Sequence, residues 1–309
     1  MNSNKPRLSM GMPVYNGENY IRQALDSLLS QTFSDFELII SDNGSTDRTE
    51  EICRAYAARD SRIHYYRNEE NRGAAWNFNR VFELAKGEYF KWVAHDDLHA
   101  PEFFAKCVEV LDRDPSIVLA YAKTAKIDGE GKLLDSIPTT IYDLHADSFS
   151  ACERFRYLIC VRHSCEPIFG VIRSDALKKT PLIRSFIGVD RALLAQLALL
   201  GRFYEVQEFL FFWRRHSLSS TVMYTLHTVG GWWDPAIKGK PVFPNSRLFI
   251  EYIILINCAS LKWNQKLVCY LHIIRWLKGN WRRLRHDVGV FGRHLMYPDR
   301  WSYIQKKEN

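Results

Sequence analysis

Residues 89–97 read Tyr-Phe-Lys-Trp-Val-Ala-His-Asp-Asp, an apolar run typical of a buried strand, and end in two adjacent carboxylates, Asp96 and Asp97. Neighbouring carboxylates repel each other, and burying them is costly unless a cation or hydrogen-bond donors compensate. Oxygen ligands suit Mg²⁺ or Mn²⁺, which usually complete their coordination with water and substrate phosphates. The run therefore predicts a divalent metal site that serves a nucleotide diphosphate. The alternative is that Asp96 caps a helix starting near Glu102, because acidic residues favour helix N-termini.

The residues before this run alternate between strand and helix patterns. Within residues 19–29, for example, Ile21, Leu25 and Leu28 recur at helical spacing. Such patterns place strands at 8–14, 36–41, 63–66 and 88–93, and helices at 19–29, from 45 onward and at 74–84. Strands that alternate with helices imply parallel strands joined by right-handed crossovers and covered by helices on both faces. The sequence therefore predicts a doubly wound α/β domain.

Polar or glycine-containing clusters follow the expected strands. They are residues 13–16, 42–47, 71–73 and 95–97. In doubly wound sheets ligands bind outside the carboxyl ends of the strands, so we expect the four clusters to surround one ligand. Their order resembles the inverting family 2 glycosyltransferases, and the resemblance extends from about residue 7 to about residue 216.

The resemblance implies a fold, an activity and partners. The fold is the GT-A (nucleotide-diphospho-sugar transferase) fold, a doubly wound mixed, mainly parallel sheet in residues 1–220, followed by a mostly helical extension in residues 221–309. The activity is metal-dependent, inverting transfer of a sugar to a hydroxyl of a glycan or lipid-linked acceptor in surface polysaccharide biosynthesis. The implied donor is a nucleotide-diphospho-sugar, expected to be a UDP-sugar, and the implied cofactor is Mn²⁺ or Mg²⁺. A non-catalytic sugar-nucleotide-binding protein stays open, because fold does not guarantee chemistry.

The first two clusters match the family's base-binding segments. By resemblance, Pro13, Val14 and Tyr15 hold the nucleotide base, and Asp42 accepts a hydrogen bond from the imide N–H that uracil has and cytosine lacks. The alternative for Asp42 is a turn residue, because the Asn-Gly dipeptide that follows it favours turns. The family more often has Asp where this chain has Asn43, so Asn43 is left out of the expected chemistry.

The third cluster matches the family's loop over the nucleotide. By resemblance Asn71, Arg72 and Gly73 line the nucleotide; Arg72 reaches the base or a phosphate, and Gly73 permits close backbone approach. The alternative is an ordinary surface loop that opens the helix at residue 74.

The fourth cluster matches the metal site. By resemblance Asp96 binds the ribose or assists at the metal, and Asp97 is the metal ligand. The family's usual Asp-X-Asp reads His-Asp-Asp here, and we expect His95 to be structural because a hard metal prefers oxygen. Further along the chain, His216 is expected as a second ligand, with a surface histidine as the alternative.

Two arginines and one carboxylate complete the expected site. Arg214 or Arg215 is expected to neutralise phosphate charge, and the alternative is a solvated basic face. By resemblance Asp190 is the general base that removes the proton of the acceptor hydroxyl. The alternative for Asp190 is the N-cap of the helix that follows it, which is expected to end at a glycine C-cap, Gly201.

The C-terminal extension differs in composition from the rest of the chain. The net charge of +7 is concentrated there, where tryptophans lie among many Lys and Arg residues. Residues 247–262 contain an apolar run too short to span a bilayer, and residues 265–285 mix apolar and basic residues at helical intervals. Such a helix can lie in a membrane interface, and the alternative is a small bundle whose basic residues are merely solvated. We expect acceptor, membrane-surface or oligomer contacts here.

Other features bound the class of protein. Hydrophobic residues make up 47% and charged residues 25%, which is typical of a folded protein. Basic residues among aromatics also describe nucleic-acid-binding proteins, but no such motif occurs and no nucleic-acid partner is expected. The N-terminal residues lack the apolar segment of a signal peptide, and the seven cysteines show no CxxC spacing. We therefore expect a cytoplasmic protein with reduced thiols, peripheral at the membrane if it contacts one.

Overall fold

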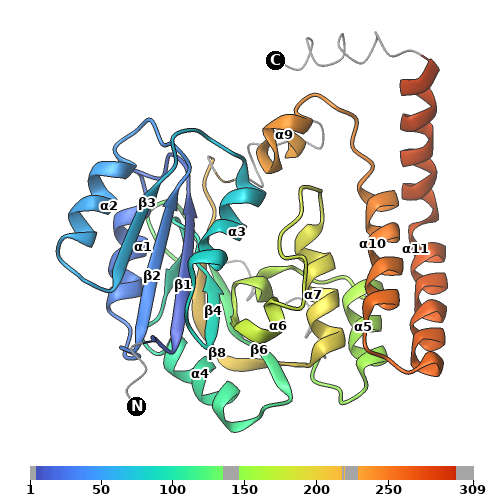
Figure 1. Ribbon diagram of the computed structural model, residues 1–309, viewed down its shortest axis with the longest axis horizontal. Helices are drawn as coiled ribbons and strands as arrows, with labels where there is room; N and C mark the ends of the chain where they lie inside the picture. Colours follow the sequence, from blue (N-terminus) through green and yellow to red (C-terminus); the bar gives the residue numbers. More distant parts are fainter. Residues whose placement is uncertain (1–4, 135–145, 218, 220–228, 297–309) are drawn as a thin grey trace.

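The centre of the protein is an eight-stranded sheet in the order β3-β2-β1-β4-β7-β6-β8-β5 (Figure 1). The computed structural model describes residues 5–134, 146–217, 219 and 229–296, the last four of these by backbone alone. The strands are β1 (Leu8–Val14), β2 (Phe36–Asp42), β3 (Ile63–Arg67), β4 (Tyr89–Trp92), β5 (Leu98–His99), β6 (Ile117–Ile127), β7 (Val171–Arg173) and β8 (Arg202–Arg214). Of these, β5 and β7 run antiparallel to their neighbours, and the other pairs are parallel. The expected mixed, mainly parallel doubly wound sheet is confirmed.

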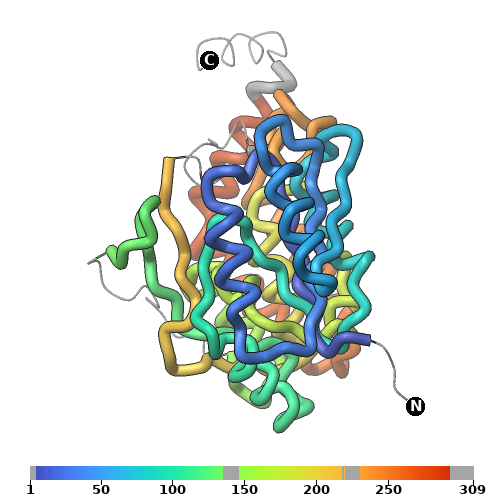
Figure 2. The backbone as a smooth tube through the Cα atoms, turned by 90° about the vertical axis from the view of Figure 1, so that its left-hand side faces the viewer, coloured from blue at the N-terminus to red at the C-terminus, as the bar shows by residue number. Residues whose placement is uncertain are grey.

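Helices cover both faces of the sheet. They are α1 (Ile21–Leu29), α2 (Thr49–Ala57), α3 (Ala74–Leu84), α4 (Phe103–Arg113), α5 (Ala151–Cys160), α6 (Ser174–Leu177), α7 (Val189–Leu200), α9 (Val229–Trp233), α10 (Pro244–Cys258) and α11 (Trp263–Met296). Because side chains alternate along a strand, Leu38 and Ile40 of β2 enter the core under α1 and α4, whereas Ile39 enters the core under α3. Figure 2 shows the blue helices of the first face in front of the sheet, with the red α11 on the far side.

The C-terminal extension shares a core with the α/β part of the chain. Tyr252 and Ile256 of α10 and Trp276 of α11 belong to the same buried apolar cluster as Phe155 of α5 and Leu194 of α7. The expected domain boundary at residue 220 lies outside the described residues, so the division of the chain stays a prediction. Among the described residues, no helix combines the length and apolar composition that crossing a membrane requires.

Gly201 is the C-cap of α7 as expected, and its backbone N–H donates to the carbonyl of Leu197. Its φ of −172° is extended backbone, so the left-handed conformation common at glycine caps is not the reason for a glycine here. A Cβ at this position would lie 2.2 Å from Cγ1 of Val118 in β6. The residue is therefore small because the connection between α7 and β8 passes closely over β6.

Candidate functional site

The first two strand tips are joined directly at the carboxyl edge of the sheet. Val14 lies opposite Asp42 in the parallel pair of β1 and β2. The backbone N–H of Asn16 then donates to Oγ of Ser45 across 2.9 Å, which ties the loop after β1 to the loop after β2. The ring of Tyr15 is 44% exposed, and the side chain of Val14 is buried. Of the residues expected to hold the base, only Tyr15 therefore offers an open aromatic face, and Pro13 and Val14 offer mainly backbone.

Asp42 is fully enclosed at the end of β2. Its Oδ1 accepts from the backbone N–H of Ser45 across 2.8 Å, and its Oδ2 accepts from the hydroxyl of Tyr65 across 2.7 Å. Burial, followed by the hydrogen bond to Asp42, raises the pKa of Tyr65. The turn role weighed above is thus present. Binding of a base by Asp42 stays a prediction, and it requires an oxygen lone pair beyond the two used here.

Asn43, which was left out of the expected chemistry, organises the third cluster. Its Nδ2 donates to Oδ1 of Asn71 across 2.8 Å, and its Oδ1 accepts from the backbone N–H of Arg72 across 3.1 Å. Arg72 is exposed, and its guanidinium lies 4.2 Å from the ring centre of Trp76. Gly73 has a φ of 87° and is buried. An amide holds this loop to β2 because it both donates and accepts, which a carboxylate does not.

The fourth cluster joins the tips of β4 and β8. Oδ1 of Asp97 accepts from the backbone N–H of Arg214 across 2.9 Å, and Oδ2 of Asp96 lies 2.9 Å from Nε2 of His216. The helix-cap alternative for Asp96 is wrong, because β5 intervenes and the N-cap of α4 is Glu102. Asp96, Asp97 and His216 are therefore brought together as expected, although His216 faces Asp96 and not Asp97.

Their surroundings shift the pKa values of the two adjacent carboxylates in opposite directions. Burial raises the pKa of Asp97 well above its usual value, and the charge of Asp96 raises it further. Burial also acts on Asp96, but His95 and His216 outweigh it and hold the pKa of Asp96 below its usual range. Oδ2 of Asp97 has no hydrogen-bond partner among the described residues. A divalent cation would supply the positive charge that the buried Asp97 lacks and could bind at its free oxygen.

Among the described residues, the side chains around Asp97 do not by themselves form a complete set of metal ligands. Within the described part of the chain, no group of three or more His, Cys, Asp or Glu side chains forms a ready metal site. Nδ1 of His216 is buried and has no hydrogen-bond partner among the described residues, and its ring centre lies 4.4 Å from that of Tyr20. A cation at Asp97 would therefore take most of its ligands from water and substrate phosphates, as is usual for Mg²⁺, and ligation by His216 stays a prediction.

The structure distinguishes Arg214 from Arg215, which the sequence alone did not. Arg214 is fully buried, and its guanidinium donates to the backbone carbonyls of Asp96, Asp128 and Gly129 and to Oε1 of Gln23. With these acceptors, Arg214 fastens the tip of β8, and the phosphate contact expected of it does not fit this geometry. Arg215 is exposed, so it is the arginine of the pair that is open to a phosphate.

Asp190 lies in the first turn of α7. Helix α7 leads through Gly201 into β8, so Asp190 lies at the end of the helix that is away from the start of that strand, and a site shared with Asp97 stays a prediction. The N-cap is Gly188, and Oδ1 of Asp190 accepts from the backbone N–H of Arg191 across 2.8 Å, so the N-cap alternative is wrong. The thiol of Cys165, which no sequence signal marked, lies against Asp190. Burial, then the Asp190 charge, raises the pKa of Cys165 well above its usual value.

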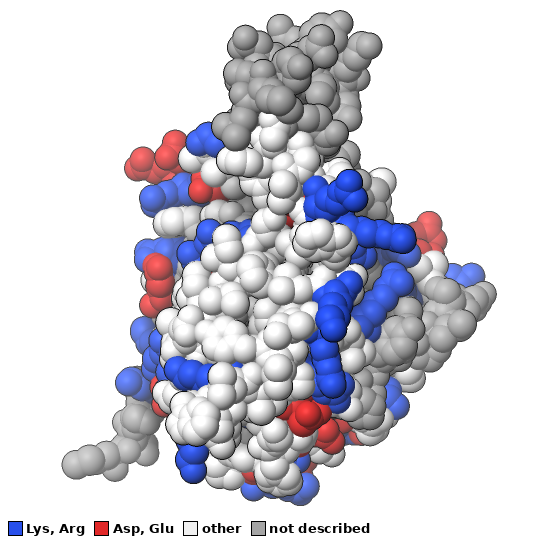
Figure 3. Space-filling view, turned by 90° about the vertical axis from the view of Figure 1, so that its right-hand side faces the viewer, with Lys and Arg blue, Asp and Glu red and all other residues white. Residues whose placement is uncertain are grey.

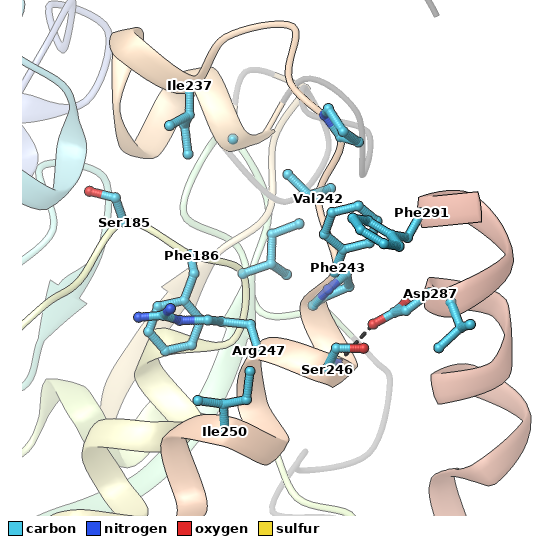
Figure 4. Close-up of a pocket in the computed structure, with 15 residues that line it drawn as sticks. Ser185, Phe186, Ile237, Val242, Phe243, Ser246, Arg247, Ile250, Asp287 and Phe291 are labelled. Atoms are coloured by element: carbon cyan, nitrogen blue, oxygen red, sulfur yellow. Dashed lines mark hydrogen bonds between the residues drawn. The ribbon is translucent and has the colours of Figure 1, made fainter. Parts of the chain in front are cut away.

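An apolar cavity of about 450 Å³ lies beside the loop that precedes Asp190 (Figure 4). This loop contributes Ser185 and Phe186, and α10, α11 and the segment after α9 form the other walls. The rings of Phe243 and Phe291 meet edge to face across 5.7 Å. An apolar group therefore has room close to the N-terminus of α7, between the catalytic half and the extension.

Comparisons with known proteins agree with this geometry. A family model described as glycosyl transferase family 2 matches residues 9–170. An uncharacterized glycosyltransferase of Rickettsia typhi is 38% identical over 128 residues, which are 41% of this chain and only 39% of that relative's length.

Two solved structures share the fold at low sequence identity. S. aureus TarS 1–349 in complex with UDP superposes with a TM-score of 0.62 at 19% identity, covering 88% of this chain and 72% of that chain. Mannosyltransferase PcManGT from Pyrobaculum calidifontis in complex with GDP-Man and Mn²⁺ has a TM-score of 0.56 at 15% identity, covering 95% of this chain and 76% of that chain. The GT-A fold expected from the sequence is thereby confirmed.

Proposed function

The chain belongs to glycosyl transferase family 2, and we propose that it transfers a sugar, with inversion, from a nucleotide-diphospho-sugar to an acceptor hydroxyl. The observation that carries the proposal is the carboxyl edge of the sheet, where Asp97 accepts from the backbone N–H of Arg214 at the end of β8 and Asp96 lies beside His216. Asp190, in the first turn of α7, is proposed to face this edge. A UDP-sugar is the proposed donor, and complexes of neighbours with UDP and with GDP-Man support a nucleotide sugar in general. Family membership favours transfer over the alternative of nucleic-acid binding.

The nucleotide is proposed to lie along the tips of β1 and β2. Tyr15 stacks on the base, and the loop of Asn71, Arg72 and Gly73 covers it, held in place by Asn43. Arg72 and Arg215 are exposed cations flanking this edge, so they can approach the phosphates. Arg214 contributes by holding the backbone N–H that orients Asp97.

A divalent cation is proposed to be held by Asp97 and His216. When bound, it would neutralise the diphosphate as negative charge grows on the leaving group. Asp96 orients His216 through the contact of 2.9 Å between them. The neighbour bound to GDP-Man and Mn²⁺ supports a metal in this fold.

Asp190 is proposed to accept the proton of the attacking hydroxyl. One carboxylate oxygen receives the backbone N–H of Arg191, and the carboxylate, with the thiol of Cys165 against it, is proposed to take the proton. The apolar cavity beside this loop suits an acceptor with an apolar part, such as a lipid-linked saccharide in surface polysaccharide biosynthesis.

Release of nucleotide diphosphate from a panel of sugar nucleotides, with Mn²⁺ or Mg²⁺ and with excess chelator, tests the proposal. Asp190→Asn should lower turnover on the order of 10³-fold while leaving nucleotide affinity unchanged, because a general base acts on the reaction and not on donor binding. Asp175→Asn, on a side chain that is 86% exposed on α6, is the matched control and should keep full activity. Turnover that persists in Asp190→Asn, or is undiminished by chelator, would contradict the assigned roles.

A further inference from the structure

Helix α11 has two apolar faces, of which folding uses one. Cys269, Ile273 and Trp276 are buried against the rest of the core. At 3.6 residues per turn, a second set of apolar side chains falls on the opposite side of the helix, within an arc of about 100°. These side chains are 48% to 76% exposed: Trp263, Leu267, Leu271, Ile274, Trp281 and Val288. A surface helix needs one apolar stripe, so the second stripe is not explained by the fold.

Basic side chains lie within or beside this second stripe, apart from Arg283 on the opposite side, and they have no acidic ion-pair partner among the described residues. Residues 263–292 carry six cations: Lys266, Arg275, Lys278, Arg282, Arg283 and Arg285. The ion pairs described nearby, Arg184 with Glu251 and Arg247 with Glu251, involve none of these six. Figure 3 looks onto this side of the molecule and shows a white expanse without charged side chains, next to a column of blue side chains.

The acid in this stretch of α11 is turned inward. Asp287 is 3% exposed, and its Oδ2 accepts from the backbone N–H groups of Asn245 and Ser246 at the start of α10. Its charge is therefore used at a helix N-terminus and does not offset the exposed cations. The face combines apolar area with uncompensated positive charge.

We propose that this second stripe of α11, with its bordering cations, docks on an anionic lipid surface. Apolar side chains would enter the headgroup boundary, and Lys and Arg would meet lipid phosphates, which is how interfacial helices bind. A second copy of the chain fits less well, because pairing two such faces would bring cations together with no exposed acid of α11 between them. The charge pattern thus selects lipid over self-association.

The apolar cavity is continuous with this surface. Val288 and Phe291 of α11 and Ile250 of α10 line the cavity and are each about half exposed or more. If the proposed function holds, an acceptor's apolar chain has a path from the lipid surface to the loop before Asp190. The docking proposal itself rests on the α11 face and not on catalysis.

Flotation of the purified full chain with vesicles is the test. We compare vesicles of phosphatidylcholine alone with vesicles that also contain phosphatidylglycerol, at low and high salt. Binding to the anionic vesicles should be at least about tenfold stronger and should weaken with salt. Leu271→Ser combined with Trp281→Ser should lower it by at least about tenfold, because the apolar anchors are lost.

Controls separate this proposal from folding and from the transferase proposal. Arg282→Glu with Arg285→Glu should abolish the anionic preference, whereas Arg59→Glu with Lys179→Glu, the same change in net charge on exposed sites elsewhere, should keep it. The Leu271/Trp281 variant should keep its melting temperature and its release of nucleotide diphosphate, so lost docking is distinct from lost catalysis. Equal binding to both kinds of vesicle overturns the proposal. So does a wild-type dimer in solution that the Leu271/Trp281 variant converts to monomer.

Discussion

The carboxyl edge of the sheet and the exposed face of α11 differ in whether their charged side chains have partners within the fold. At the edge, Asp42, Arg214 and Asp96 each have a partner in another element of the fold, so their positions are fixed before any ligand arrives. On α11, cations lie within or beside an apolar stripe and have no acidic partners among the described residues. Fixed partners give a site its geometry, and absent partners give a surface its capacity to bind something outside the chain. Three substitutions test how firmly this difference holds.

Replacing Arg214 should have the largest effect on stability. Arg214→Ala removes a buried guanidinium and leaves the carbonyls of Asp96, Asp128 and Gly129 without a donor. We expect a loss of about 3 kcal/mol or more in the free energy of unfolding, measured by urea denaturation. Arg215→Ala, at the exposed neighbour, should change it by less than about 0.5 kcal/mol. Equal losses in the free energy of unfolding at the two positions would contradict the distinction between Arg214, which has partners in the fold, and the exposed Arg215.

Gly73, at the carboxyl edge, packs against the end of α9, and its replacement should have the next largest effect. A Cβ there would lie 2.6 Å from the carbonyl oxygen of Trp233, and the φ of 87° is strained for other residues. Gly73→Ala should therefore cost about 2 kcal/mol in thermal or chemical unfolding. Gly279→Ala is the control, since a Cβ there meets nothing within 4 Å, and alanine should stabilise that helix by up to about 1 kcal/mol. If Gly73→Ala left the free energy of unfolding unchanged, the close approach of residue 73 to Trp233 would not be rigid.

Lys91 is a buried lysine, and its contribution to the free energy of unfolding should depend on pH. Burial lowers its pKa to about 7, whereas the unfolded chain keeps the proton up to 10.5. The unfolded state therefore binds more protons above pH 7, so the free energy of unfolding should rise with pH, by about 1.5 kcal/mol from this group between pH 7 and 8.5. In Lys91→Met that part of the rise should vanish in denaturation curves taken across this range. Parallel pH profiles for the two proteins would refute the assignment.

The strands and the backbone path of the edge could be predicted from sequence, because alternation of apolar residues and strand-end clusters are local signals. The expected strand at residues 8–14 coincides with β1, and that at 36–41 with all but the last residue of β2. What could not be predicted depends on contacts between distant segments. Choosing between Arg214 and Arg215 requires knowing that Gln23 and Asp128 surround one of them.

The same limit applies to two residues that the sequence did not mark. Asn43 matters because of Asn71 and Arg72, which are far from it in the chain and near it in space. Cys165 matters through its contact with Asp190. The roles of Asp42, Asp97, His216 and Asp190 in binding and catalysis remain predictions that the function assay addresses.

One contact links the C-terminal helices to the loop before Asp190. A Cβ at Gly188, two residues before Asp190, would lie 3.0 Å from the side chain of Leu248 in α10. The loop that presents Asp190 is thus shaped partly by the C-terminal helices. A chimera in which a foreign tail replaces these helices should therefore change the shape of that loop, so the tail is not expected to behave as an exchangeable module.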